Sequence, residues 1–356
     1  MKFTLVIAGL LSAALAHPEQ LSHREIQRRN EISKRCAAST GSFTRKRAEK
    51  RAEKRAEKRA EKRAEKRAEK RAEKRAEKRK RVAKRWAGAG NTTFQIQTEA
   101  PYYDSFQNDT CVLSSIVTEG PYVWPESQTL RQDMSEGQPG VPLWMDIGVI
   151  DINTCEPLPD VLLNFWHCNA TGSYSSFTGL SPNTPFPELL EQLGYNVDDF
   201  EIGVTDLHTD DTTFHRGMWP TNAEGLAEMK TTFPGFYVGR AIHIHVQVFT
   251  DWTLHSNGTV SSGNIVSTGQ LYFGEDLSAQ LMALEPYVSH TQINRTLNSA
   301  DSIYVVGSDD GYNPIFSVVP ADGENYENGL IGYITIGVDP TAYGINNTYN
   351  GDPPIV

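Results

Sequence analysis

Two closely spaced histidines suit metal chemistry. The run Arg240-Ala241-Ile242-His243-Ile244-His245 is typical of a strand, and alternate residues of a strand share one face, so His243 and His245 project together. Two imidazoles fixed on one rigid strand can act as paired metal ligands. A hydrogen-bonded pair of surface histidines is the alternative, and the His-x-His pattern alone does not separate these two interpretations.

Tyrosines accompany this pair in the sequence. Tyr237 lies just upstream, after a Phe-Pro-Gly-Phe run, and Tyr174 follows the end of another expected strand and a glycine turn. No His-Glu-x-x-His, Gly-x-Ser-x-Gly or dinucleotide-binding glycine motif offers a competing chemistry. Among the other histidines, His208, His215 and His255 are isolated and are expected to be ordinary surface or loop residues. His167 is expected to pack structurally around the site.

Short strands must position these residues. From about Thr92 onward, β-branched, aromatic and apolar residues form short segments punctuated by Gly, Pro, Asn and Asp. Many short strands with few helices predict an all-β fold, a β-sandwich core with short helices and long loops. The expected strands are Leu143–Ile152, Val161–Cys168, Leu226–Phe233, Ile242–Phe249, Gln270–Phe273 and Ile331–Gly337, the helices are Pro187–Leu193 and Leu277–Leu284, and the surface loops are Arg295–Asp301 and Ser308–Asn313.

Five motifs follow one another between roughly residues 110 and 275. They are Glu119-Gly120-Pro121-Tyr122, the Trp-His-x-Asn-x-x-Gly-x-Tyr-Ser core within Asp160–Ser175, Phe214-His215-Arg216-Gly217, Thr221-Asn222-Ala223-Glu224-Gly225, and the Pro-Gly-x-Tyr…Arg-x-x-His-x-His run of Pro234–His245. In this order, and above all in its tyrosine and histidine elements, the sequence resembles the intradiol ring-cleavage dioxygenases, particularly their secreted fungal branch.

The resemblance implies a non-haem Fe(III) cofactor bound by two tyrosinates and two histidines. The donor types agree with this, because a phenol with an unperturbed pKa of about 10 binds as phenolate only to a strongly polarising ion. Fe(III) is such an ion, whereas zinc sites usually take Cys, His or carboxylate ligands. Carried over by motif, the expected metal ligands are Tyr174, Tyr237, His243 and His245.

The resemblance also implies a substrate and a reaction. A small aromatic diol of the catechol type would bind through both oxygens and displace Tyr237, and O2 would then open the ring between the two hydroxylated carbons. Arg240 matches the catalytic arginine beside the substrate, where its permanent charge would stabilise developing negative charge. Gly120, Pro121 and Tyr122 are expected to line the substrate pocket.

A catalytically inactive protein with the same fold is the alternative. Such a β-sandwich would be a binding or cell-wall-associated protein. Its histidines would form only a hydrogen-bonded pair, and its tyrosines would be buried aromatics. The resemblance favours the enzyme.

The charged residues are unevenly distributed. Residues 1–85 carry 29 Lys and Arg against 11 Asp and Glu, a net charge of +18, and the remainder carries five cations against 33 acidic residues, a net charge of −28. Because so acidic a body repels phosphate backbones and anionic lipids, we expect no nucleic-acid partner for the folded part. We expect the same field to favour neutral catechols over carboxylated ones as substrates, and salt to reduce the difference in rate between the two.

The N-terminus is typical of a secreted protein. Met1–Ala16 combines a positive Lys2 with an apolar run too short to span a bilayer, and a small-x-small site predicts cleavage after Ala16. A buried N-terminal helix is the alternative. The C-terminal residues carry no membrane-anchor signal, so we expect an extracellular product. Six glycosylation sequons agree with this route: Asn91, Asn108, Asn169, Asn257, Asn294 and Asn346.

A basic low-complexity segment follows the signal. Residues 48–79 contain eight copies of Ala-Glu-Lys-Arg, which as a helix would stack identical charges at i,i+4 and could only be solvated. Each copy also presents a Lys-Arg pair, the kind of site that dibasic processing proteases cut, with a last cut expected after Arg85. Removal as a propeptide and retention as a spacer both stay open. The expected organisation is a signal peptide (1–16), a basic region (17–85), an intradiol dioxygenase-like β-sandwich domain (92–340) and a C-terminal tail (341–356).

Four cysteines allow three pairings in an oxidising compartment. We expect Cys155 to pair with Cys168, because these two flank a candidate strand pair, and Cys36 to pair with Cys111. Removal of everything up to Arg85 would take Cys36 away and leave an odd number of cysteines.

Overall fold

The computed structural model describes residues 31, 34–36, 39–43, 117–124, 129–202, 204–256, 260–261, 263–308 and 313–342. The chain divides into two units, residues 1–41 with 107–356 and residues 42–106. The predicted cleavage positions, Ala16 and Arg85, lie outside the described residues, as does the whole of the Ala-Glu-Lys-Arg repeat. The β-structure described below belongs to the first unit.

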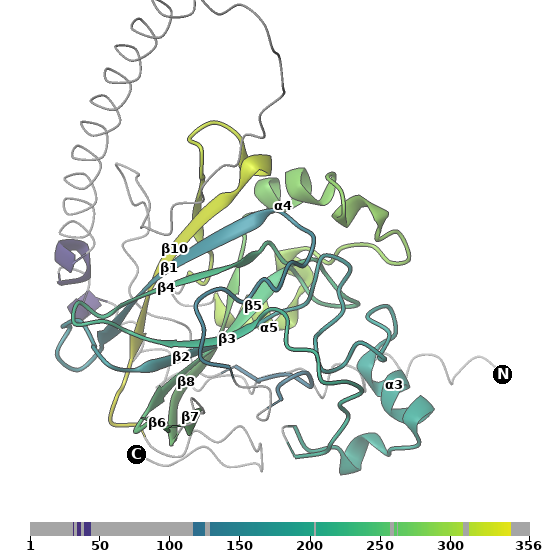
Figure 1. Ribbon diagram of the computed structural model, residues 1–356, viewed down its shortest axis with the longest axis horizontal. Helices are drawn as coiled ribbons and strands as arrows, with labels where there is room; N and C mark the ends of the chain where they lie inside the picture. Colours follow the sequence, from purple (N-terminus) through teal and green to yellow (C-terminus); the bar gives the residue numbers. More distant parts are fainter. Residues whose placement is uncertain are drawn as a thin grey trace, which may run out of the picture. The chain divides into compact units, whose positions relative to one another are not determined.

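One four-stranded sheet has the order β4-β1-β10-β9 (Figure 1). Its centre is the parallel pair β1 (Pro142–Asp151) and β10 (Leu330–Val338), which align along their whole length. β4 (Leu226–Thr232) and β9 (Ser317–Pro320) pair antiparallel with the two outer sides of that pair. This sheet is the scaffold against which the second sheet packs.

The second four-stranded sheet has the order β3-β2-β5-β8 and is antiparallel throughout. It consists of β2 (Leu162–Trp166), β3 (Arg216–Pro220), β5 (His243–Thr250) and β8 (Asn264–Tyr272). A short separate hairpin pairs β6 (Thr253–Leu254) with β7 (Val260–Ser261). The predicted all-β architecture, two packed sheets with a few short helices, is therefore confirmed.

The core lies between the two sheets. Alternate residues of β1, among them Met145 and Ile147, share one hydrophobic cluster with Phe165 of β2 and with Ile244 and Val246 of β5. Each of these side chains is 1% exposed or less, so the cluster is close to fully removed from water. Burial of this apolar area supplies the main driving force for folding.

The opposite face of the second sheet carries polar side chains that are also buried. His243, His245 and Gln247 of β5 alternate with the apolar residues that face the core. The strand register places His245 between Trp166 of β2 and Gln270 of β8. A row of polar groups thus lies on a rigid central strand, under cover of other segments.

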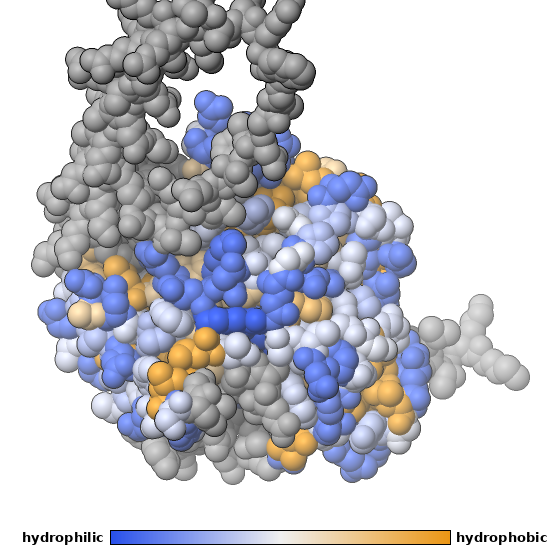
Figure 2. Space-filling model, viewed as in Figure 1, coloured by the Kyte–Doolittle hydropathy of each residue, from blue (hydrophilic) through white to orange (hydrophobic). Residues whose placement is uncertain are grey.

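Short helices and turns complete the described chain. The helices are α3 (Phe186–Leu193), α4 (Glu275–Met282) and α5 (Ser302–Gly307), and none of the described helices is long and apolar enough to cross a membrane. Short 3-10 turns occupy Val197–Asp199, Tyr287–Ser289, Asn298–Ala300 and Tyr326–Asn328. Figure 2 shows polar residues spread over one face, with apolar residues in several separate groups.

All six predicted strands and both predicted helices correspond to observed elements, and β8 begins earlier than expected. The surface-loop prediction for Arg295–Asp301 is wrong over its last four residues, because Asn298–Ala300 forms a 3-10 turn with Asn298 buried, and Asp301 is buried and caps α5. Residues 309–312 of the other predicted loop lie outside the described residues.

The cysteine predictions are wrong. The structure joins Cys36 to Cys155, and Cys168 is a buried free thiol, so neither expected pair, Cys155–Cys168 or Cys36–Cys111, forms. The reason is topological: Cys155 follows β1 and Cys168 follows β2, and these strands belong to different sheets rather than to one hairpin. Cys111 itself lies outside the described residues.

Candidate functional site

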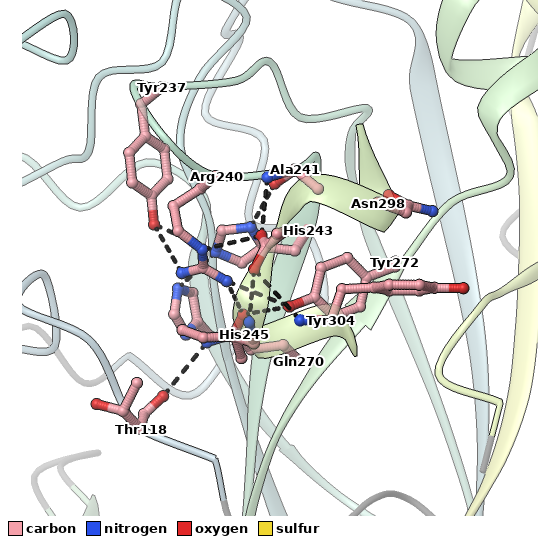
Figure 3. A network of polar contacts seen from close by, with 12 residues as sticks. Thr118, Tyr237, Arg240, Ala241, His243, His245, Gln270, Tyr272, Asn298 and Tyr304 are labelled. Carbon is pink, nitrogen blue, oxygen red and sulfur yellow. Dashed lines mark hydrogen bonds and ion pairs between the residues drawn. The ribbon is translucent and has the colours of Figure 1, made fainter. Parts of the chain in front are cut away.

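The histidine pair of β5 lies at the centre of the polar face (Figure 3). The Nε2 atoms of His243 and His245 are 3.0 Å apart, and the two residues are 2% and 1% exposed. His243 Nδ1 donates to the carbonyl of Ala241 at 2.6 Å, so its proton is on Nδ1 and the Nε2 lone pair points at the neighbouring ring. The two imidazoles therefore present convergent nitrogens.

Both tyrosines predicted from the motifs reach the same place. The Tyr237 hydroxyl lies 3.3 Å from His243 Nε2, and the Tyr174 ring lies 5.5 Å from the Tyr237 ring and 6.2 Å from the His245 ring. The Tyr174 hydroxyl is buried and has no hydrogen-bond partner among the described residues, although a buried hydroxyl ordinarily finds one. The structure thus brings the four expected ligands together and leaves one of their oxygens without a partner.

The segment before β1 closes one side of the site. Tyr122 stacks on Tyr174 with ring centroids 4.5 Å apart, and Pro121 beside it is half-buried. Gly120 has φ +75, and a Cβ at this position would lie 3.3 Å from His245 Cε1. Glycine is needed here for both the left-handed backbone and the close approach to the imidazole. Of the three predicted pocket residues, Tyr122 thus lies against Tyr174 and Gly120 against His245.

Arg240 is held by a network of four side chains (Figure 3). Its Nε donates to Asp301 Oδ2 at 2.9 Å, its Nη2 donates to Gln270 and to the Tyr272 hydroxyl at 3.2 Å, and its Nη1 lies 3.4 Å from the Tyr237 hydroxyl. The Tyr272 hydroxyl also donates to Gln270 at 2.8 Å. The guanidinium is therefore fixed beside a candidate ligand rather than free to rotate.

A second arginine fixes the tyrosine side of the site. Arg216 of β3 is 4% exposed, and it donates to the hydroxyl and carbonyl oxygens of Ser175 and to the carbonyl of Tyr122 at 2.7–2.9 Å. It thereby ties the segment that carries Tyr122 to the loop that carries Tyr174. Five donors in a planar fork suit this kind of clamp.

Burial shifts the titration of every candidate ligand toward its neutral form. Desolvation raises the pKa of Tyr237 to about 12 against the opposing charge of Arg240, and it raises the pKa of Tyr174 well above its ordinary value. Burial also lowers the pKa of His243 to about 3 and that of His245 well below its ordinary value. Neutral imidazoles are the form that binds metals, whereas buried phenols lose their protons only to a strong positive charge.

The donor set fits a hard, highly charged metal ion. Within the described part of the chain, no group of three or more His, Cys, Asp or Glu side chains is arranged to hold a metal ion, so a metal here needs the tyrosines. Two convergent imidazole nitrogens, a phenol within 3.3 Å of one of them and a second phenol without a partner suit Fe(III). The residues present are thus compatible with the ferric ion that the sequence resemblance implies.

Four further histidines carried a prediction, and the structure contradicts one of these predictions. His208 and His255 are exposed, as predicted, and buried His167 bonds to the Cys168 carbonyl and to a threonine, which agrees with a packing role. The surface prediction for His215 is wrong, because this residue is fully buried and stacks on His167 with centroids 4.3 Å apart.

Sequence reasoning missed the residues that hold the site in place. Asp301, Gln270 and Tyr272 surround Arg240, and Arg216 holds the tyrosine loops. Only Asp301 carried a readable signal, since an Asp that precedes a Ser-Ile-Tyr-Val run is typical of a helix N-cap. The sequence offered no cue that this cap also pairs with an arginine 61 positions upstream.

Comparisons with known proteins support the fold. No family model and no curated protein matches the sequence. Among solved structures, the intradiol ring-cleavage dioxygenase from Tetranychus urticae is 24% identical with a TM-score of 0.51, and the match covers 66% of this chain and 98% of that chain. A further dioxygenase structure matches with the same values. The chain therefore has an intradiol dioxygenase-like fold.

Proposed function

We propose that this protein is a secreted intradiol dioxygenase that cleaves the ring of catechol-type compounds with O2. Its Fe(III) would be held by Tyr174, Tyr237, His243 and His245. The observation that carries this proposal is the convergence of two imidazole nitrogens and two buried phenols at one point, one phenol having no partner of its own. The fold likeness supports it, and its assignment to the fungal branch rests on the sequence resemblance alone.

Each part of the site has a task in this reaction. When bound, the ferric ion would supply Lewis acidity toward the diol oxygens. Tyr122 and Pro121 offer an apolar wall for the aromatic ring. As phenolate, the Tyr237 oxygen can accept a proton from an incoming hydroxyl, and Arg240 Nη1, 3.4 Å away, stabilises the negative charge on either oxygen.

The secretory part of the proposal rests on other observations. The Cys36–Cys155 disulfide agrees with folding in an oxidising compartment. Of the glycosylation candidates, Asn294 is exposed, and Asn169 is half-buried with its side-chain oxygen accepting three hydrogen bonds in the turn before Tyr174. The other candidates lie outside the described residues: Asn91, Asn108, Asn257 and Asn346. A dibasic processing protease remains the proposed partner for cleavage after Arg85.

A pair of matched tyrosine variants tests the proposed ligand set. The Tyr174 hydroxyl has no hydrogen bond, whereas the Tyr287 hydroxyl donates to the Phe233 carbonyl at 2.7 Å and accepts from Val141 N at 2.9 Å. We expect Tyr174→Phe to abolish the visible iron–phenolate absorption of the iron-loaded protein, and to lower oxygen uptake with catechol by more than about 100-fold at nearly unchanged stability. Tyr287→Phe should instead lower the unfolding free energy by about 1–3 kcal/mol, while the iron-loaded protein keeps its visible absorption.

Three outcomes would reject the proposal. One is a wild-type protein that stays colourless and binds no stoichiometric iron. Another is oxygen uptake with catechol that survives in Tyr174→Phe. The third is a coloured wild-type protein that leaves every tested catechol intact, which would point instead to an inactive binding protein with this fold.

A further inference from the structure

The side chain of Arg240 has almost no hydrogen-bonding capacity left for a substrate. A guanidinium has five N–H donors, and four of those of Arg240 are directed at Asp301, Gln270, Tyr272 and Tyr237. Bidentate recognition of a carboxylate needs two parallel N–H groups on one edge of the fork. Since Asp301 and its neighbours already use the Nε and Nη2 atoms, Arg240 cannot offer such an edge to an anionic ring substituent.

Asp301 is the group that fixes and neutralises this arginine. Its side chain is fully buried, and its Oδ2 accepts from Arg240 Nε at 2.9 Å and from Ala241 N at 2.8 Å. Its Oδ1 accepts from the backbone of Ile303 and Tyr304 at the start of α5. Burial would raise the pKa of Asp301, but the Arg240 charge outweighs it and holds the pKa below its ordinary value, so the carboxylate is ionised.

The other cations of the acidic body are also committed to protein partners. Arg216 is 4% exposed and bonded to Ser175 and to the Tyr122 carbonyl, so its charge lies behind the tyrosine loops. The last three pair with carboxylates: Arg131 with Glu136, Lys230 with Asp133 at 2.6 Å, and Arg295 with Glu275 at 2.6 Å. Of the five cations after residue 85, each therefore has its own protein partners.

We propose that Asp301 is a specificity-determining residue: by occupying and neutralising Arg240, it makes the site select uncharged catechols over carboxylated ones. Asp301 does not touch the substrate, so it acts as a positioning residue through Arg240. The inference rests on the proposed ring-cleavage function and adds to it a substrate class. The buried Arg240–Asp301 pair acts at short range, whereas the field of the whole acidic body acts at long range. Salt screens the long-range field and hardly affects the buried pair, so salt separates the two effects.

The test compares two substrates of nearly equal shape and different charge, 3,4-dihydroxybenzamide and 3,4-dihydroxybenzoate. For the iron-loaded full-length protein, we expect kcat/KM for the amide to exceed that for the carboxylate by at least about tenfold. The ratio should persist in 0.5 M salt, because screening acts on distant charges and hardly on a buried pair. Asp301→Asn should lower the ratio by about tenfold, since it removes the neutralising charge.

Asp133→Asn is the matched control. Like Asp301→Asn, this substitution removes one negative charge, and it leaves Lys230 without its carboxylate partner. Asp133, however, lies beside β4 in the other sheet. We expect its substrate ratio to equal that of the wild type. A ratio that shifts equally in both variants would overturn the inference in favour of the overall acidic field.

The wild-type protein keeps the proposal testable even where Asp301→Asn does not fold. Equal turnover of the two substrates, or a preference for the amide that vanishes in 0.5 M salt, overturns the role of Asp301 and leaves ring cleavage intact. Absence of turnover of both substrates and of catechol overturns the proposed function, and this inference with it.

Discussion

This protein contains two buried histidine pairs, and they differ in the groups that their ring nitrogens face. In the pair His167–His215, the rings stack with centroids 4.3 Å apart; both nitrogens of His167 bond outward at 2.7 Å, to the Cys168 carbonyl and to a threonine, and Nε2 of His215 bonds to Thr232 at 2.9 Å. In the pair His243–His245, the Nε2 atoms point at each other at 3.0 Å, with a phenol beside them. Burial depresses the pKa of members of both pairs, so burial alone does not mark the functional one.

The difference lies in where the lone pairs point. Both nitrogens of His167 bond to protein oxygens, a carbonyl and a hydroxyl, so this histidine stabilises the fold and has no need of a ligand. The nitrogens of the second pair converge with phenols, and such a set of nitrogen and oxygen atoms is one that a cation can bind. The first pair is thus structural, and the second is where we place the ferric site.

The sharpest test of this contrast substitutes one member of each pair. We expect His243→Asn to lower iron affinity by more than about 100-fold with the fold intact, because it removes a proposed ligand. We expect His167→Asn to keep stoichiometric iron and to cost about 1–3 kcal/mol of unfolding free energy, because its hydrogen bonds are structural. Iron content by mass spectrometry and urea unfolding measure the two effects. Iron loss of equal size in both variants would contradict the division of roles.

Acidification should act on the structural pair in a defined window. Burial lowers the pKa of His167 to about 4 and that of His215 well below its ordinary value. Below about pH 6.5 the unfolded chain takes up protons that the folded protein does not, so stability is fully present above that pH and falls toward pH 4. The His167 contribution to this loss is about 3 kcal/mol. Urea unfolding of wild type and His167→Gln at several pH values checks it, and parallel pH profiles would refute it.

A smaller effect should come from two glycines with the same backbone conformation. Gly120 and Gly239 both have φ +75, but an added Cβ lies 3.3 Å from His245 Cε1 at the first position and within 4 Å of nothing at the second. Alanine at either site costs about 1 kcal/mol of backbone strain. Only Gly120→Ala should also displace the imidazole and lower kcat/KM, by about tenfold. Equal kcat/KM values for the two alanine variants would show that the close contact between Gly120 and the His245 ring does not affect activity.

Periodicity in the sequence was enough to predict the central strands and the shared face of His243 and His245. The edge strand β3 (Arg216–Pro220) escaped prediction because Arg-Gly-Met-Trp-Pro shows no apolar alternation and ends in a proline that only an edge tolerates. His215 escaped because its burial depends on stacking against a residue 48 positions away. No local pattern encodes such a contact.

The site divides in the same way. The four candidate ligands lie within recognisable motifs, whereas the groups that hold Arg240 come from β8 and from the turn before α5, and were missed. The cysteine prediction failed for a related reason. Proximity in sequence suggested one strand pair, but the two strands joined different sheets.

The Cys36–Cys155 bond changes what processing of the precursor would yield. A cut after Arg85 breaks the backbone, but the peptide that carries Cys36 stays covalently attached to the turn after β1. The product would then consist of two disulfide-linked chains, a short basic chain and the acidic domain, instead of the acidic domain alone. On a denaturing gel it would migrate as one species until a thiol reductant separates the two chains.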